Sequence, residues 1–195
     1  MKNIFLILNI FILTAISCNA QSTISLEEAA VYPEQPDGRM LPLNTIYVKD
    51  INNSLNKYTG NWKGSLNGKI YEFSFIKKEN VGGYDVNWDF IVGRFRITNS
   101  FGVIFYDSTT ELDDDKTKFW GKNFQPDLKA YVMYFVGNSI GCAEAGDVYL
   151  IIQPATPNQM SIIMIPDNDT TEEGDCPSNF QPTIPYKKTI NLTKQ

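Results

Sequence analysis

The segment 62–77 reads WKGSLNGKIYEFSFIK and predicts a β-hairpin. Asn67-Gly68 at its centre is a strong signal for a two-residue type I′ turn, because both central residues of that turn need positive φ. After the turn, Tyr71, Phe73 and Phe75 alternate with polar residues, which places all three rings on one face of a strand. One face of the hairpin is therefore apolar and the other polar.

The same pattern continues along the chain, where short apolar runs are separated by Gly, Pro and Asn. Trp88 and Phe90 alternate with their neighbours in the next run, and Gly93 is expected to mark a bulge. The count of eight or nine strands with almost no helix favours an all-β fold. A single antiparallel barrel is favoured over a sandwich because strands with one aromatic face suit a barrel interior. The further strands are expected at 86–92, 103–107, 119–124, 131–136, 147–152, 160–165 and 189–193.

Composition excludes several classes of protein. The hydrophobic fraction is 43% and the net charge is −5, with Lys and Arg scattered along the chain. A nucleic-acid surface needs clustered cations, so that class is disfavoured. Histidine is absent, which excludes Ser-His-Asp and Cys-His triads and every His-ligated zinc or haem site. No cofactor is expected.

Residues 1–20 have the layout of a secretory signal peptide: Lys2, an apolar run over 4–13, and small residues up to Ala20. Two kinds of processing remain open. Residues 15–18, Ala-Ile-Ser-Cys, form a lipobox-like motif, which predicts a lipid on Cys18 and is the preferred of the two. Alternatively, cleavage after Ala20 frees a secreted chain that begins at Gln21. Residues 21–43 contain three prolines and predict an extended tether, so the barrel domain is assigned to 44–195.

Two cysteines remain beyond the leader, Cys142 and Cys176. An even pair in an oxidising compartment predicts a disulfide.

A short helix is expected over 49–58, where Ile51, Leu55 and Tyr58 are spaced by four and three residues. With Gly60 and Trp62 directly after it, this opening resembles that of lipocalin-like (calycin) barrels. The resemblance implies that the helix closes one barrel end and that Gly60 and Trp62 are structural. Those barrels usually place a late Arg against the Trp, which the arginines of this chain do not match. The leader resembles those of uncharacterised secreted and lipoprotein families from flavobacteria-type organisms, which implies no substrate.

Three groups of residues are candidate sites. Acidic runs occur at 111–115 and 167–175; the second begins like an EF-hand calcium loop but has Glu172 where the sixth-position glycine is required, and no helices flank it, so no metal site is assigned. Glycosidases use paired acids, but Glu72, Asp85 and Asp89 are also expected on the solvent face of a sheet, so no catalytic residue is assigned. The aromatic residues are the third group, either lining a pocket for an apolar ligand or filling the barrel: Tyr71, Phe73, Phe75, Trp88 and Phe90.

The sequence thus predicts an exported, lipid-anchored or secreted barrel that binds a small apolar ligand or an envelope protein. The alternative is a structural or interaction protein whose barrel is filled and holds no ligand. Contact with a membrane is expected only through a lipid on Cys18, and an enzyme is the third and least favoured class.

Overall fold

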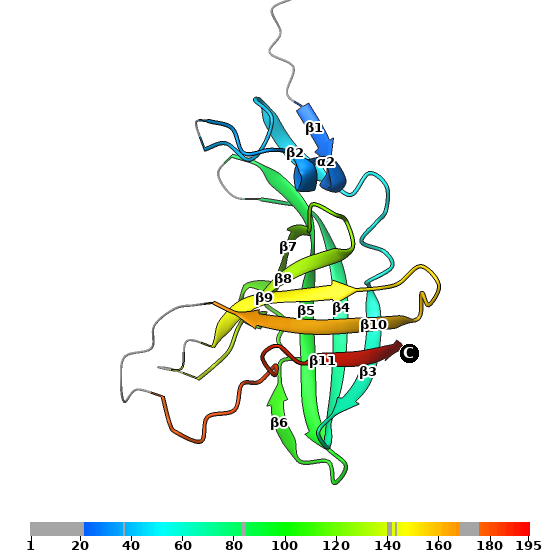
Figure 1. Cartoon of the computed structure of the whole chain (residues 1–195), viewed down its shortest axis with the longest axis vertical. Helices are drawn as coiled ribbons and strands as arrows, with labels where there is room; N and C mark the ends of the chain where they lie inside the picture. The colour runs from blue at the N-terminus through cyan, green and yellow to red at the C-terminus, as the bar shows by residue number, and fades with distance from the viewer. Residues whose placement is uncertain (1–21, 37, 83–84, 140–141, 143, 168–175) are drawn as a thin grey trace, which may run out of the picture.

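The computed structural model of the 195-residue chain describes residues 22–36, 38–82, 85–139, 142, 144–167 and 176–195 (Figure 1). The predicted leader, both cleavage points and Cys18 lie outside the described residues, as does most of the second acidic run. Among the described residues, no helix is long and apolar enough to cross a bilayer.

Eleven strands form one sheet in the described part of the chain. The nine strands expected from the sequence correspond to β3–β11, and two more, β1 and β2, lie nearer the N-terminus. The short helices are α2 (Leu26–Val31) and the 3-10 turn η1 (Asp114–Thr117). The strands are β1 (Ser22–Ser25), β2 (Thr45–Lys49), β3 (Gly60–Leu66), β4 (Lys69–Gly82), β5 (Asn87–Asn99), β6 (Ile104–Asp107), β7 (Phe119–Phe124), β8 (Ala130–Val136), β9 (Ala145–Ile151), β10 (Gln159–Pro166) and β11 (Thr189–Lys194).

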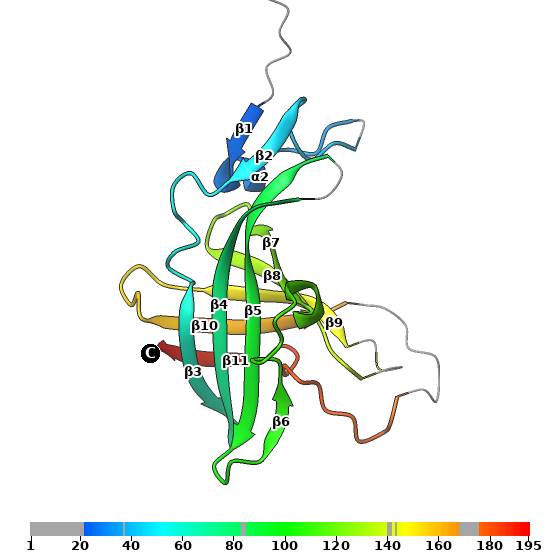
Figure 2. The same ribbon diagram turned by 180° about the vertical axis from the view of Figure 1, so that it is seen from behind.

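Eight strands close into an antiparallel barrel in the order β5-β4-β3-β11-β10-β9-β8-β7 (Figures 1 and 2). The ring closes where Leu192 of β11 pairs with Gly64 of β3, and where Trp120 of β7 pairs with Val92 of β5. The remaining strands lie off the ring: β6 pairs with one end of β5, while β2 and β1 add parallel strands at its other end. The prediction of an all-β barrel with almost no helix is confirmed.

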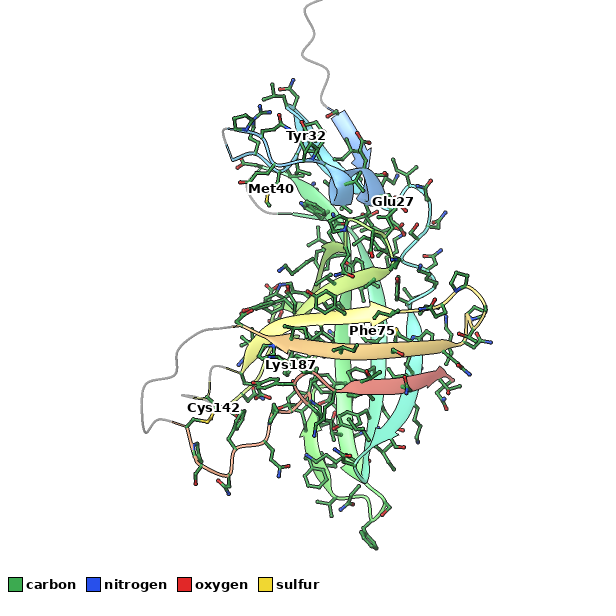
Figure 3. All side chains as sticks on the ribbon, in the orientation of Figure 1. Glu27, Tyr32, Met40, Phe75, Cys142 and Lys187 are labelled. Carbon is green, nitrogen blue, oxygen red and sulfur yellow. A yellow bond between two sulfur atoms is a disulfide. The ribbon has the colours of Figure 1, made fainter. Side chains whose placement is uncertain are left out.

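Aromatic rings fill the barrel interior, among them Phe75, which is labelled in Figure 3. Phe73 of β4 packs against Phe95 of β5, with ring centroids 5.0 Å apart, and Phe119 of β7 meets Phe75 at 5.9 Å. Phe135 of β8 completes the contact across the barrel, 5.7 Å from Phe119. All five rings are 2% exposed or less. A barrel of eight strands is just wide enough for its own side chains to fill it, and these rings do so.

Residues 50–59 cover the end of the barrel nearest β1 and β2, which we call the N-terminal end. The segment is anchored by Asp50, whose carboxylate accepts the Ser54 N–H at 2.7 Å and lies 2.9 Å from the Lys77 ammonium. The carboxylate of Asp89 accepts the Asp50 N–H at 2.9 Å, so both buried acids have partners. Tyr58 is fully buried beneath this turn, and its carbonyl accepts the indole N–H of Trp62 at 2.8 Å.

The opposite end, which we call the hairpin end, carries the β3–β4 and β5–β6 turns. Residues 176–188, the C-terminal strap, run past this end and insert the fully buried Ile184 into the core. The strap is fixed by the disulfide between Cys142 and Cys176 and by the Glu144 carboxylate, which accepts the Thr183 N–H. The predicted disulfide is confirmed, and the barrel is covered at both ends.

The helical content differs in position from the sequence expectation. Over 51–58 the chain makes consecutive turns, with bonds such as Tyr58 N–H to the Leu55 carbonyl, instead of a helix. The buried Asp50 carboxylate takes up backbone N–H groups that a helix would bond internally. The helix α2 lies instead in the segment expected to be extended, where Ser25 caps it by accepting the Glu28 N–H.

Gly93 does not mark a bulge, because it pairs in regular register with Phe75. The irregularity between β4 and β5 lies between Lys78 and Val81. A Cβ at Gly93 would stand 2.3 Å from the Phe119 ring, so the glycine is needed for the close approach of that ring.

Reducing the Cys142–Cys176 disulfide should lower the unfolding free energy by about 3–4 kcal/mol, because it releases a closed loop in the unfolded chain. Urea unfolding of the chain from Gln21 onward, with and without reductant, measures this difference. A Cys142→Ser/Cys176→Ser variant should match the reduced chain. Thiol titration of the denatured, unreduced chain should find no free thiol; two free thiols or equal unfolding midpoints would contradict the account.

Candidate functional site

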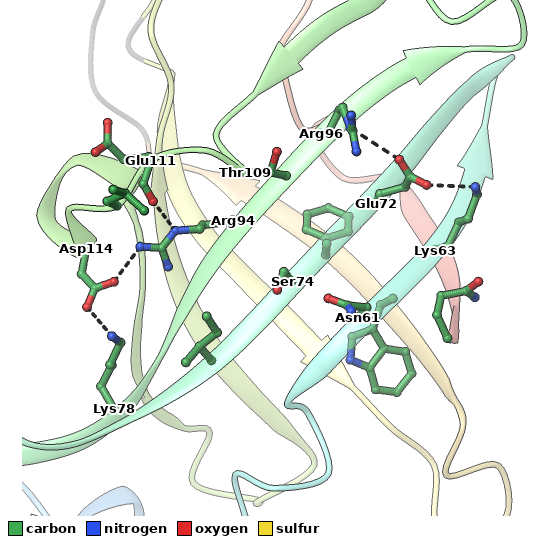
Figure 4. Close-up of a pocket in the computed structure, with 15 residues that line it drawn as sticks. Asn61, Lys63, Glu72, Ser74, Lys78, Arg94, Arg96, Thr109, Glu111 and Asp114 are labelled. Carbon is green, nitrogen blue, oxygen red and sulfur yellow. Dashed lines mark hydrogen bonds and ion pairs between the residues drawn. The ribbon is translucent and has the colours of Figure 1, made fainter.

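An open groove of about 640 Å³ runs along the outer face of the barrel (Figure 4). Its floor is formed by the outward-facing side chains of β3, β4 and β5, and the segment 108–117 overhangs one side. Most of the outward side chains that line the groove are polar, as expected for the solvent-facing side of an antiparallel sheet, and Ile76 is an apolar exception. The groove residues used below are Lys63, Glu72, Ser74, Lys78, Arg94, Arg96, Thr109, Glu111, Leu112 and Asp114.

Arg94 clamps the overhanging segment to the sheet. Its Nε donates to the Glu111 carbonyl at 2.6 Å, and its terminal nitrogen donates to Asp114 at 2.8 Å. The Lys78 ammonium lies 2.7 Å from the other oxygen of Asp114. The Arg94 side chain is only 10% exposed, whereas the side chains of Lys78 and Asp114 are each 35% exposed, so solvent is excluded from the guanidinium but not from the whole clamp.

The clamp lowers the pKa of Asp114 below its ordinary value of 3.8. The hydrogen bond from Lys78 is the largest cause; burial opposes it, and the hydrogen bond from Arg94 adds to the lowering. The pKa of Asp114 is lower in the folded chain than in the unfolded chain. The ionised carboxylate therefore stabilises the fold fully only at pH values above the unfolded pKa. This stabilisation is lost as the pH falls through the lowered folded value.

A second group of charges lies at the other side of the groove. Glu72 stands 2.9 Å from the Lys63 ammonium and 3.6 Å from Arg96 Nε. All three side chains are more than one third exposed, so solvent weakens their attraction. Arg96 Nε makes no hydrogen bond to the described residues although the atom itself is buried. This side of the groove therefore offers accessible charges, while Arg96 Nε is buried and its nearest acidic partner is Glu72.

The groove continues into a second hollow of about 680 Å³ that is more apolar. Lys78, Leu112 and Asp114 line both hollows, and Phe90 and Trp120 line the second. Leu112, at 93% exposure, projects from the overhang between them. The outer surface of β4, β5 and β7 thus presents charged and apolar side chains next to one another.

The five aromatic residues singled out in the sequence lie on two faces. Tyr71, Phe73 and Phe75 point into the barrel and are buried, while Trp88 and Phe90 are partly exposed and line a hollow on the outer surface. In β5 the inward set is instead Ile91, Phe95 and Ile97. The structure therefore does not bring the five rings together around one space.

The structural residues proposed from the resemblance occupy constrained positions. Gly60 has a φ of +104°, a conformation that side chains rarely adopt. Trp62 is 1% exposed, and the Lys194 ammonium from the last strand lies 5.2 Å from its ring centroid.

The acidic candidates are also separated. Glu72 faces the groove, whereas Asp89 is buried at the N-terminal end, where it accepts the Tyr47 hydroxyl at 2.5 Å. Burial raises the pKa of Tyr47, and the hydrogen bond to Asp89 and the charge of Asp89 raise it further, to about 12. Asp113 caps η1, and Asp167 accepts the Tyr134 hydroxyl. Among the described residues no group of three or more acids or cysteines is arranged to hold a metal ion.

The groove itself was not identified from the sequence. The sequence feature that could have indicated the groove is the pair Arg94 and Arg96 on the polar face of β5. These residues pair with Ser74 and Glu72 of β4. The overhang that turns this polar face into a groove depends on contacts between residues far apart in the chain, which alternation does not reveal.

Replacing Arg94 by Met should release the 108–117 overhang, because Asp114 and the Glu111 carbonyl lose a shielded charged donor. We expect faster amide exchange across this segment and a loss of about 1–3 kcal/mol in unfolding free energy. Lys63→Met removes a partner of an exposed pair and serves as the control, with an expected loss below about 1 kcal/mol. Unchanged exchange at 108–117 in the Arg94 variant would contradict the clamp.

No curated protein and no solved structure was found to match this chain. One family model matches residues 1–168, a range that includes the groove-forming strands β3, β4 and β5 and ends before the strap and β11. The chain belongs to a family of unknown function, DUF6705.

Proposed function

We propose that this protein is an exported binding module that engages a partner protein through the outer groove, with the filled barrel as a rigid scaffold. The observation that carries the proposal is the contrast between the two faces of β4 and β5. Inward side chains are buried among one another, whereas outward side chains form an open groove with exposed charges.

The packed interior disfavours the alternative of a small apolar ligand held inside the barrel. Such a ligand needs a concave apolar space, and the described rings already occupy the barrel axis, with centroids 5.0–6.4 Å apart. Both ends are covered as well, by residues 50–59 and by the strap. A ligand would have to displace side chains at several positions to enter.

The chemistry of the groove favours a protein partner with both charged and apolar side chains. Cations and carboxylates alternate along it, and Leu112 and Trp120 provide exposed apolar contacts beside them. Protein interfaces combine aromatic and arginine side chains in this way, with a polar rim. A purely apolar or strongly anionic ligand would leave part of these groups without partners.

Export is supported by the signal-like leader and by the disulfide, which is typical of oxidising compartments. We extend the proposal to a lipid on Cys18, which would hold the barrel at a membrane while the groove stays accessible to envelope proteins. The alternative is release after cleavage at Ala20, which would leave the same groove on a soluble chain.

Site-specific photo-crosslinking in the producing cell tests the proposed groove. A photoreactive residue at Ser74 or Thr109 stands in the groove, while the same residue at Ser161, on the outer face of β10, is the matched control. We expect discrete crosslinked products from both groove positions and none from Ser161. Charge reversal by Glu72→Lys should reduce these products at least fivefold.

Equal crosslinking from Ser74 and Ser161, or none from either groove position, would refute the proposal and favour a purely structural barrel. Products that Glu72→Lys leaves unchanged would mean that the groove charges do not select the partner.

A further inference from the structure

Four large apolar side chains are exposed together on the β5–β6 turn and on β6. Phe101 is 90% exposed, and Val103, Ile104 and Phe105 are each more than half exposed. The turn lies at the extremity of the hairpin end, opposite β1 (Figures 1 and 2). We call residues 99–105 the apolar hairpin.

The fold does not need these side chains for the turn. Asn99 makes it, because its side-chain oxygen accepts the N–H groups of Phe101 at 2.9 Å and Val103 at 3.0 Å. Gly102 supplies the positive φ of +81°. Phe101 contributes almost no buried surface to the folded chain, although surface turns usually carry polar residues. The contacts among the described residues therefore do not account for its apolar character.

Positive charge accompanies the apolar hairpin. The Lys69 ammonium lies 5.0 Å from the Phe105 ring centroid. Lys69 and Lys188 also line a hollow of about 580 Å³ at this end, and no carboxylate is among the residues that line it. The acid nearest along the hairpin, Asp107, is at the far end of β6 and bonds to Thr109. This local excess of cations is notable in a chain whose net charge is −5.

We propose that the apolar hairpin docks on the surface of a bilayer that contains anionic lipid. Exposed apolar side chains beside lysines are the combination that partitions into the headgroup region, with the rings below and the ammonium groups at the phosphates. Phe101 and its three apolar neighbours enter the interface, and Lys69 and Lys188 contact the headgroups. The contact is independent of the outer groove and of a lipid on Cys18.

The position of the hairpin decides which surface it can reach. Ser22 follows the potential anchor Cys18 by four positions and begins β1, at the other end of the molecule from the apolar hairpin (Figure 1). When β1 faces the membrane that holds the lipid anchor, the apolar hairpin points away from that membrane. It can then reach a second membrane surface.

Vesicle co-sedimentation tests the docking, with the chain from Gln21 onward, which keeps every described residue and lacks Cys18. We expect binding to vesicles of phosphatidylcholine and phosphatidylglycerol at 3:1, at least fivefold stronger than to phosphatidylcholine alone, and weakened by salt. Phe101→Ser/Phe105→Ser should lower the partition coefficient at least tenfold on anionic vesicles. Lys69→Gln should lower it about fivefold, since one cation near the surface contributes about that factor.

Leu112→Ser is the matched control, because Leu112 is as exposed as Phe101 but lies on the groove overhang. It should bind vesicles as the unchanged chain does. Phe101→Ser alone provides a milder variant, and circular dichroism checks that each variant is folded. No binding to anionic vesicles, or equal losses in the hairpin and Leu112 variants, would overturn the proposal. Hairpin variants that abolish self-association of the protein without changing vesicle binding would assign the patch to a protein contact instead.

Discussion

The contact of Phe73, Phe95, Phe119 and Phe135 across the barrel axis is the constraint on which the structure depends. Eight strands enclose a space that a few aromatic rings fill, and here the rings come from β4, β5, β7 and β8. Gly93 is part of the same constraint, since the Phe119 ring occupies the position where a Cβ would stand. Because the interior is filled by the chain itself, we assign the proposed recognition to the outer surface of the barrel.

The two barrel ends are held by different chemistry. At the N-terminal end, Lys77 offsets the buried charge of Asp50, and Asp89 accepts N–H and hydroxyl donors, so the cost of burying the two acids is reduced. At the hairpin end a covalent bond and the Glu144 carboxylate hold the strap. Both sets of contacts join segments that are distant in sequence. Together they separate the core from solvent, while the outer face of β3–β5 remains exposed.

Much of the fold follows from the sequence because antiparallel strands with one solvated face alternate clearly. The strand segment Lys69–Lys77 shows this, since every second residue from Tyr71 to Phe75 is aromatic and buried. The orientation of β5 is harder to predict from the sequence. Both of its faces carry apolar residues, so alternation alone does not decide whether Phe90 or Ile91 points inward. The groove could not be predicted either, because Arg94 becomes a clamp only when a segment twenty residues later folds over it. The parallel pairing of β1, β2 and β5 likewise rests on contacts that local patterns do not encode.

A crystal structure of the chain from Gln21 onward, determined under xenon pressure, tests most directly whether the barrel is filled. Xenon enters apolar cavities that packed side chains leave empty. We expect no anomalous xenon peak among Phe73, Phe95 and Phe119, and no lipid density along the barrel axis. A xenon site or a bound lipid between these rings would show a hollow barrel, and the function would then have to be sought inside it.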